Sequence, residues 1–78
     1  MVDKKQVLID FGKRLKKIRL SKKISQEKLA LDIDFHRTYI SLIERGERNV
    51  TLFSIHRIAE ILEVDPSEFF IEDDGRWD

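Results

Sequence analysis

The sequence contains no cysteine and only two histidines, His36 and His56. Without thiols the chain forms neither a disulfide framework nor a thiolate metal site, and two separate histidines do not supply the ligands of a zinc site. We therefore expect no bound metal and no cofactor. The fold must be held together by the packing of apolar side chains.

Turn-forming residues are also scarce, with one proline and three glycines. This disfavours a fold of many short strands, whereas 41% hydrophobic residues is too high for a disordered chain. No run approaches about 20 apolar residues, and the N-terminal Met-Val-Asp-Lys-Lys lacks the apolar region of a signal peptide. We therefore expect a helical, cytoplasmic protein with no membrane partner.

The length of 78 residues is near the lower limit for one hydrophobic core, which excludes a second, catalytic domain. We expect a single domain over residues 1–78, with its core at about 5–71 and an acidic tail at 72–78.

The sequence has no net charge, because 15 basic residues balance 15 acidic ones. The balance hides an asymmetry: residues 1–28 carry ten Lys or Arg and three Asp or Glu, whereas residues 60–78 carry one and eight. Such a bipolar chain is compatible with solvated helix faces as well as with a DNA-binding surface. Charge alone therefore does not identify a partner.

Four helix starts are indicated by capping residues that lie between two apolar residues five positions apart, as in a hydrophobic staple. The capping residues are Ser25, His36, Thr51 and Asp65. The signal is strongest at Asp65, because Pro66 follows it and Glu68 completes a capping box.

A further helix near the N-terminus is indicated by apolar residues at helical spacing, namely Leu8, Phe11, Leu15 and Ile18. The sequence therefore predicts an all-α fold of five helices. We place them near residues 5–22, 26–33, 37–44, 52–62 and 66–70.

The second and third predicted helices are joined by a tight turn at residues 32–36, which is typical of a helix-turn-helix unit. In such a unit the second helix projects from the body and fits the major groove of DNA, which is about 12 Å wide. The small Ala30 allows close packing between the two helices. The residues expected to face inward are Leu29, Ile33, Ile40 and Ile43.

Two runs in this unit are diagnostic, Ser25-Gln26-Glu27-Lys28-Leu29-Ala30 and Arg37-Thr38-Tyr39-Ile40-Ser41-Leu42-Ile43-Glu44-Arg45-Gly46. Over about residues 11–70 the chain resembles the lambda-repressor-like helix-turn-helix family. The positions that keep the family's spacing are Arg19, Gln26, Ala30, Ile40, Glu44 and Gly46.

Within that family, residues 37–41 together with Arg48 and Asn49 are most similar to the controller proteins of restriction-modification systems. Two residues depart from the family pattern. Asp34 occupies a turn position where the family usually has glycine and where we expect left-handed backbone. His36 replaces the Ser or Asp that commonly caps the third helix.

The resemblance implies sequence-specific binding of double-stranded DNA through the third helix. Base contacts are expected from Arg37, Thr38 and Ser41, because arginine at the start of a recognition helix can pair bidentately with guanine. Contacts to the DNA backbone are expected from Gln26, Tyr39, Arg48 and Asn49. A neutral surface role for Ser41 and packing against the second helix for Tyr39 are alternatives.

The resemblance also implies that Arg19 and Glu44 form a largely buried ion pair between the first and third helices. We expect a homodimer, since one recognition helix contacts too few base pairs for useful discrimination. The apolar residues in excess of one small core are expected to form its interface: Phe53, Ile61, Val64, Phe70, Ile71 and Trp77.

The sequence shows no nucleophile paired with a base and no glycine-rich phosphate loop, so we expect neither an enzyme nor a small-molecule ligand. We expect a homodimeric transcriptional regulator on a palindromic operator. The controller resemblance implies that it regulates its own restriction-modification operon. The alternatives are a phage-type repressor, an antitoxin autoregulator, and a module of the same fold that binds a protein partner.

Overall fold

The computed structural model describes residues 1–71, and within them it contains four α-helices followed by one short 3₁₀ helix. They are α1 (Lys4–Ser21), α2 (Gln26–Asp32), α3 (Arg37–Glu44), α4 (Leu52–Leu62) and η1 (Pro66–Phe70). The predicted acidic tail and Trp77 lie outside the described residues. Among residues 1–71 no strand is present, and no helix has the length and apolar character needed to cross a membrane.

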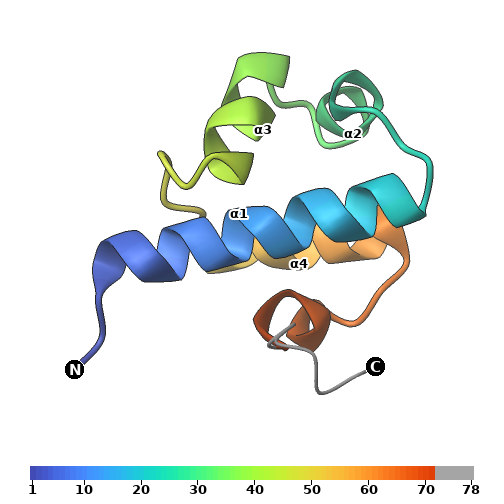
Figure 1. Ribbon diagram of the computed structural model, residues 1–78. Coiled ribbons are helices and arrows are strands. Elements are labelled where there is room, and N and C mark those ends of the chain that lie inside the picture. The colour runs from blue at the N-terminus through green and yellow to red at the C-terminus, as the bar shows by residue number, and fades with distance from the viewer. Residues whose placement is uncertain (72–78) are drawn as a thin grey trace.

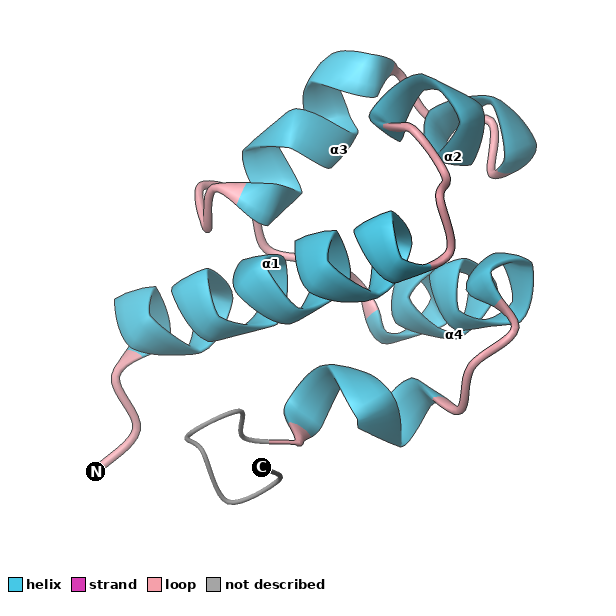
Figure 2. Ribbon diagram, turned by 45° about the vertical axis from the view of Figure 1, so that its right-hand side comes forward, coloured by secondary structure: helices cyan, strands magenta, loops and turns pink. Residues whose placement is uncertain are grey.

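The longest helix, α1, runs through the middle of the molecule, with α3 on one side of it and η1 on the other (Figure 1). The second helix, α2, packs against α3 and also contacts α4. Figure 2 shows α4 beyond α1, with η1 beneath both. The helix-turn-helix of α2 and α3 thus forms one layer, and α1, α4 and η1 support it from below.

The core takes side chains from every element. The largest fully buried side chains are Leu15, Leu29, Ile33, Ile40, Ile43, Ile58, Leu62 and Phe69. The four residues predicted to face inward from the helix-turn-helix are all 0% exposed, so that prediction is confirmed. Burying each such side chain stabilises the fold by about 1.5–3 kcal/mol.

The predicted capping residues begin their helices as expected. Ser25 accepts a hydrogen bond from the Lys28 N–H, and Thr51 accepts one from the Ser54 N–H. His36 also caps, because its Nδ1 accepts from the Thr38 N–H at 3.1 Å. Asp3, which was not predicted as a cap, accepts a hydrogen bond from the Gln6 N–H and starts α1.

The prediction of a fifth α-helix is wrong, because residues 66–70 form a 3₁₀ helix. Five residues close too few i→i+4 hydrogen bonds to offset the cost of α-helix nucleation, whereas the tighter 3₁₀ turn is common in short segments. The carboxylate of Asp65 caps this turn by accepting from the Ser67 N–H at 2.9 Å, rather than from the backbone of Glu68.

Hydrogen bonds from Ser67 lower the pKa of Asp65 below its ordinary value, and the bond from its backbone N–H has a larger effect than the bond from its side chain. The charge of His56 acts in the same direction. A carboxyl group whose pKa is lowered by folding stabilises the fold above its unfolded pKa. This contribution is lost as the pH falls through the lowered, folded pKa. The Asp65 cap therefore stabilises η1 at neutral pH and loses this effect in acid.

The turn between α2 and α3 has the left-handed backbone expected at Asp34, with φ of 60°. The backbone N–H of Asp34 donates to Leu31 O at 3.2 Å, and that of Phe35 donates to Ala30 O at 2.8 Å. These two bonds end α2 and turn the chain into α3. They need the positive φ, which is costly for any residue that has a Cβ.

Replacing Asp34 with glycine is expected to stabilise the protein by about 0.5–1 kcal/mol. The substitution removes the steric cost of left-handed backbone, about 1–2 kcal/mol. Part of this gain is offset because glycine loses more conformational entropy than other residues on folding. Thermal unfolding should show a rise of several degrees, since about 1 kcal/mol corresponds to about 4–8 °C in a domain of this size. Asp34→Ala is the control, because it keeps the Cβ and should not be stabilised. A lower melting temperature for Asp34→Gly would show that the aspartate side chain holds the turn.

Candidate nucleic-acid interface

The outer face of α3 carries the residues predicted to contact bases. Arg37 and Thr38 are exposed, Ser41 is half-buried one turn further along, and Arg45 follows on the same face. The opposite face is buried in the core. An α-helix with its side chains is about 10–12 Å across, so α3 fits the major groove of DNA, which is about 12 Å wide.

The inner side of α3 lies directly on α1 at Gly12. A Cβ at this position would lie 2.4 Å from the carbonyl oxygen of Ile43 and 2.6 Å from that of Glu44. Only glycine allows such an approach, so any larger residue would push the end of α3 away from α1. This contact fixes how closely the end of α3 approaches α1.

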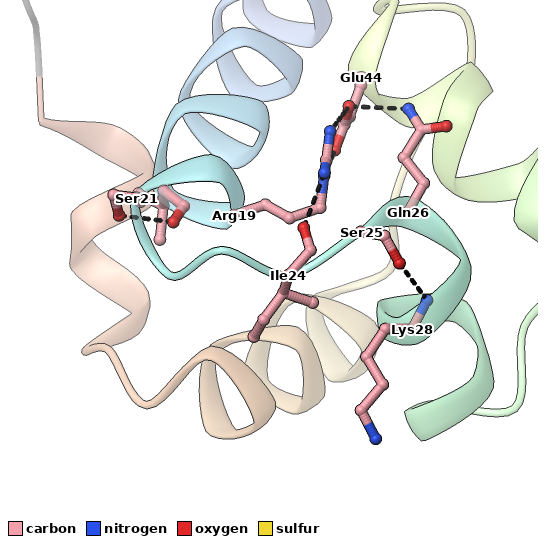
Figure 3. Close-up of polar contacts among 8 residues, drawn as sticks. Arg19, Ser21, Ile24, Ser25, Gln26, Lys28 and Glu44 are labelled. Carbon is pink, nitrogen blue, oxygen red and sulfur yellow. Dashed lines mark hydrogen bonds and ion pairs between the residues drawn. The ribbon is translucent and has the colours of Figure 1, made fainter.

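A buried ion pair ties the same end of α3 to α1, as Figure 3 shows. Arg19 donates from Nε to Glu44 Oε2 at 2.6 Å and from Nη2 to Glu44 Oε1 at 3.0 Å. Its Nη1 donates to the carbonyl oxygen of Ile24 at 2.8 Å. The two residues are 5% and 8% exposed. The pair therefore joins α1, the loop before α2 and the end of α3.

Gln26, which was predicted to contact a phosphate, has a protein partner in this network. Its Nε2 donates to Glu44 Oε1 at 2.9 Å (Figure 3). The side chain therefore links the first residue of α2 to the last residue of α3. Its contact with a phosphate stays a prediction. The bond to Glu44 could not be predicted from local patterns, because the two residues are 18 positions apart on different helices.

Tyr39 packs against the turn before α3 and also contacts a cationic side chain. Its ring stands edge-on against Phe35, with centroids 4.9 Å apart and an interplanar angle of 88°. The guanidinium carbon of Arg48 lies 5.8 Å from the centroid of the Tyr39 ring, within the range of a cation–π contact. The half-buried tyrosine therefore packs inside the protein, and it also lies beside the loop that follows α3.

The end of α3 and the loop that follows it carry three exposed polar side chains. Arg48 and Asn49 are exposed, as is Arg45, which was not predicted to contact DNA. Arg45 forms an exposed ion pair with Glu47 at 3.5 Å. Gly46 starts the loop with φ of 76°, and a Cβ there would lie 2.8 Å from Ile9 in α1. The loop is thereby held against the body.

The residues predicted to form a dimer interface divide into two groups. Phe53, Phe70 and Ile71 are 73%, 55% and 37% exposed. By contrast, Ile61 and Val64 are half-buried and pack against the core. Leu52, which precedes Phe53, is 72% exposed and was not predicted. The exposed residues of the predicted interface therefore lie at the start of α4 and at the end of η1.

Comparisons with known proteins agree with this geometry. The helix-turn-helix family matches residues 15–69. The chain is 56% identical over 59 residues to "Control protein C.BamHI" of Bacillus amyloliquefaciens, covering 74% of this chain and 73% of that protein.

Two solved structures are similar in fold and sequence. The crystal structure of the restriction-modification controller protein C.AhdI from Aeromonas hydrophila has a TM-score of 0.78 and 43% identity, covering 81% of this chain and 96% of the other. The controller protein C.Esp1396I, described as a tetramer in complex with its natural 35 base-pair operator, has a TM-score of 0.73 and 45% identity, covering 82% and 84%. The chain therefore belongs to the helix-turn-helix family and, within it, to the control proteins of restriction-modification systems.

Proposed function

We propose that this protein binds a palindromic operator as a homodimer and regulates transcription of a restriction-modification operon that includes its own gene. The observation that carries the proposal is the outer face of α3, where exposed Arg37 and Thr38 stand on a helix anchored from behind by Gly12 and the Arg19–Glu44 pair. A rigid, projecting helix with an exposed arginine at its start suits the major groove. The protein acts by binding and needs no catalytic group.

Within this interface we assign base contacts to Arg37, Thr38 and Ser41. We assign DNA-backbone contacts to Tyr39, Arg48 and Asn49, with Gln26 at the start of α2 as a further candidate. The cation–π contact supports the assignment of Arg48, because it holds the guanidinium beside the recognition helix before DNA binds. A side chain held in place loses less entropy when it reaches a phosphate.

We further propose that dimers assemble on paired operator sites. The related C.Esp1396I is described as a tetramer on a 35 base-pair operator. A recognition helix of eight residues reads few base pairs, and a two-fold dimer doubles the number of bases that are read. We assign the dimer contact to the exposed apolar residues Phe53, Phe70 and Ile71, with the half-buried Ile61 and Val64 at its edge.

Arg37→Ala is expected to lower affinity for the operator by about 1–3 kcal/mol per contact and to relax the preference for one base pair in each half-site. A bidentate arginine discriminates bases, so affinity for scrambled duplex should change little. Titration of the variant against operator and scrambled duplexes measures both. An equal loss on the two duplexes would reassign Arg37 to the phosphate backbone.

The same titrations separate DNA binding from the alternative of a protein-interaction module. Binding to DNA phosphates releases counterions, so affinity should fall steeply as salt rises. The operator itself can be found by selecting binders from a random duplex library. A chain that selects no duplex, and whose partner binding is insensitive to salt, would contradict the proposed function.

A further inference from the structure

His36 caps α3 with one nitrogen of its imidazole ring and leaves the other nitrogen free. Its Nδ1 accepts a hydrogen bond from the Thr38 N–H at 3.1 Å. A neutral imidazole carries a single N–H, so a ring that accepts at Nδ1 carries its proton on Nε2. The side chain is exposed, and among residues 1–71 no protein group accepts a hydrogen bond from Nε2. The cap therefore leaves one unused hydrogen-bond donor, Nε2–H.

This donor lies at the projecting end of the recognition helix. The two ring nitrogens point in nearly opposite directions, so an imidazole whose Nδ1 faces the first turn of α3 directs its Nε2–H away from the helix. Figures 1 and 2 both show the chain entering α3 at the end farther from α1, whereas the other end of α3 lies against Gly12. The Nε2–H therefore extends from α3 at the end that stands away from α1.

We propose that His36 is a specificity-determining residue whose Nε2–H donates to the N7 atom of a purine in the major groove. This inference rests on the proposed function, in which α3 enters that groove. The N-terminal residues of a recognition helix meet the base edges, and Arg37 and Thr38 follow His36 directly. Guanine and adenine both present N7 as an acceptor, whereas cytosine presents an amino donor on the same edge. A single donor at this point therefore favours a purine and rejects cytosine.

The cap prepares this donor for binding. The hydrogen bond from the Thr38 N–H holds the ring in one orientation, so the side chain loses less conformational entropy when it reaches a base. The other good capping side chains do not offer the same donor. An aspartate is only an acceptor, and a serine hydroxyl lies close to the backbone. Histidine at this position therefore both caps the helix and extends a donor beyond it.

The first test is NMR of the imidazole nitrogens of His36 in the free protein, under conditions where the ring is neutral. We expect the proton to be on Nε2, because Nδ1 accepts the capping bond. A ring that carries its proton on Nδ1 would overturn the proposal, since its Nε2 could not donate. This measurement involves no DNA, so its outcome is independent of the proposed function.

The second test is the binding of His36→Ser, which keeps a capping oxygen and withdraws the extended donor. Its melting temperature should stay near that of the wild type. Its affinity for the operator that the wild type selects should fall by about 3–10-fold per half-site, the effect of one neutral hydrogen bond, while affinity for scrambled duplex stays the same. Thr51→Ser is the matched control, because it also exchanges one helix cap for another, at α4, and should change neither affinity.

The base that His36 contacts is found by replacing the purines of the operator, one at a time, with 7-deaza analogues, which lack the N7 acceptor. The wild type should lose affinity at the purines that His36 and Arg37 contact. In His36→Ser one of these losses in each half-site should vanish, because the donor is already absent, and the loss that belongs to Arg37 should remain. The vanished loss identifies the purine.

Three binding results would overturn this role of His36 while leaving DNA binding by the wild type in place. An unchanged operator affinity for His36→Ser would leave the imidazole as a cap alone. An equal loss on operator and scrambled duplexes would direct the imidazole to a phosphate. Persistence of every 7-deaza loss in His36→Ser would remove the contact with N7. A wild-type protein that selects no duplex would instead contradict the proposed function, and this inference with it.

Discussion

Arg19→Met is expected to lower the free energy of unfolding by about 3–5 kcal/mol, because it leaves the buried carboxylate of Glu44 without its cation. The change also removes the donor to the Ile24 carbonyl, which lies in the loop before α2. A small domain has a total stability of only about 5–15 kcal/mol, so the variant should unfold at a markedly lower temperature and urea concentration. Circular dichroism during thermal and urea unfolding measures the loss.

Two further variants separate burial of the pair from loss of a charge. Lys16→Met removes an exposed cation from the same helix and should change stability by no more than about 0.5 kcal/mol. Arg19→Met combined with Glu44→Met removes both charges and should recover part of the stability, since an apolar pair needs no desolvation of ions. A native-like melting curve for Arg19→Met alone would mean that the pair is open to water in solution.

The sequence predicted best what depends on local chemistry. Ser25, Thr51 and Asp65 cap their elements because a short polar side chain beside an exposed N–H is a local signal. The start of α3 followed from apolar spacing, although His36 is an unusual cap. The outer face of α3 followed from the same helical periodicity that buried Ile40 and Ile43.

Features that arise between elements were predicted less well. The choice between α-helix and 3₁₀ helix at residues 66–70 depends on a balance of a few hydrogen bonds. Capping residues and proline mark the start of either kind of helix, so they do not predict which one forms. The bond from Gln26 to Glu44 appears only once α2 and α3 are placed together. Excess apolar composition did not separate exposed Phe53 from half-buried Ile61, since only the packed structure shows which side of α4 is covered.

Phe53→Lys is expected to give a folded monomer that has lost its affinity for the palindromic operator. The side chain is 73% exposed, so a lysine there costs the isolated fold little. In a two-fold interface, however, each substitution places two like charges near each other in a contact shielded from water. Operator binding should fall by about 10²–10⁴-fold, because the second half-site is no longer bound at high effective concentration. Affinity for a single half-site should stay that of the wild-type monomer.

Sedimentation and circular dichroism together decide the result. Leu31→Lys is the matched control, because Leu31 is 75% exposed on α2, outside the proposed interface, and its variant should sediment as the wild type does. Phe70→Lys is a less clean probe, since the ring of Phe70 lies 5.9 Å from that of Phe11 and supports the packing of η1 on α1. A folded Phe53→Lys protein that still sediments as a dimer would move the interface away from the start of α4. The end of η1, where Phe70 and Ile71 are exposed, would then be the next contact to test.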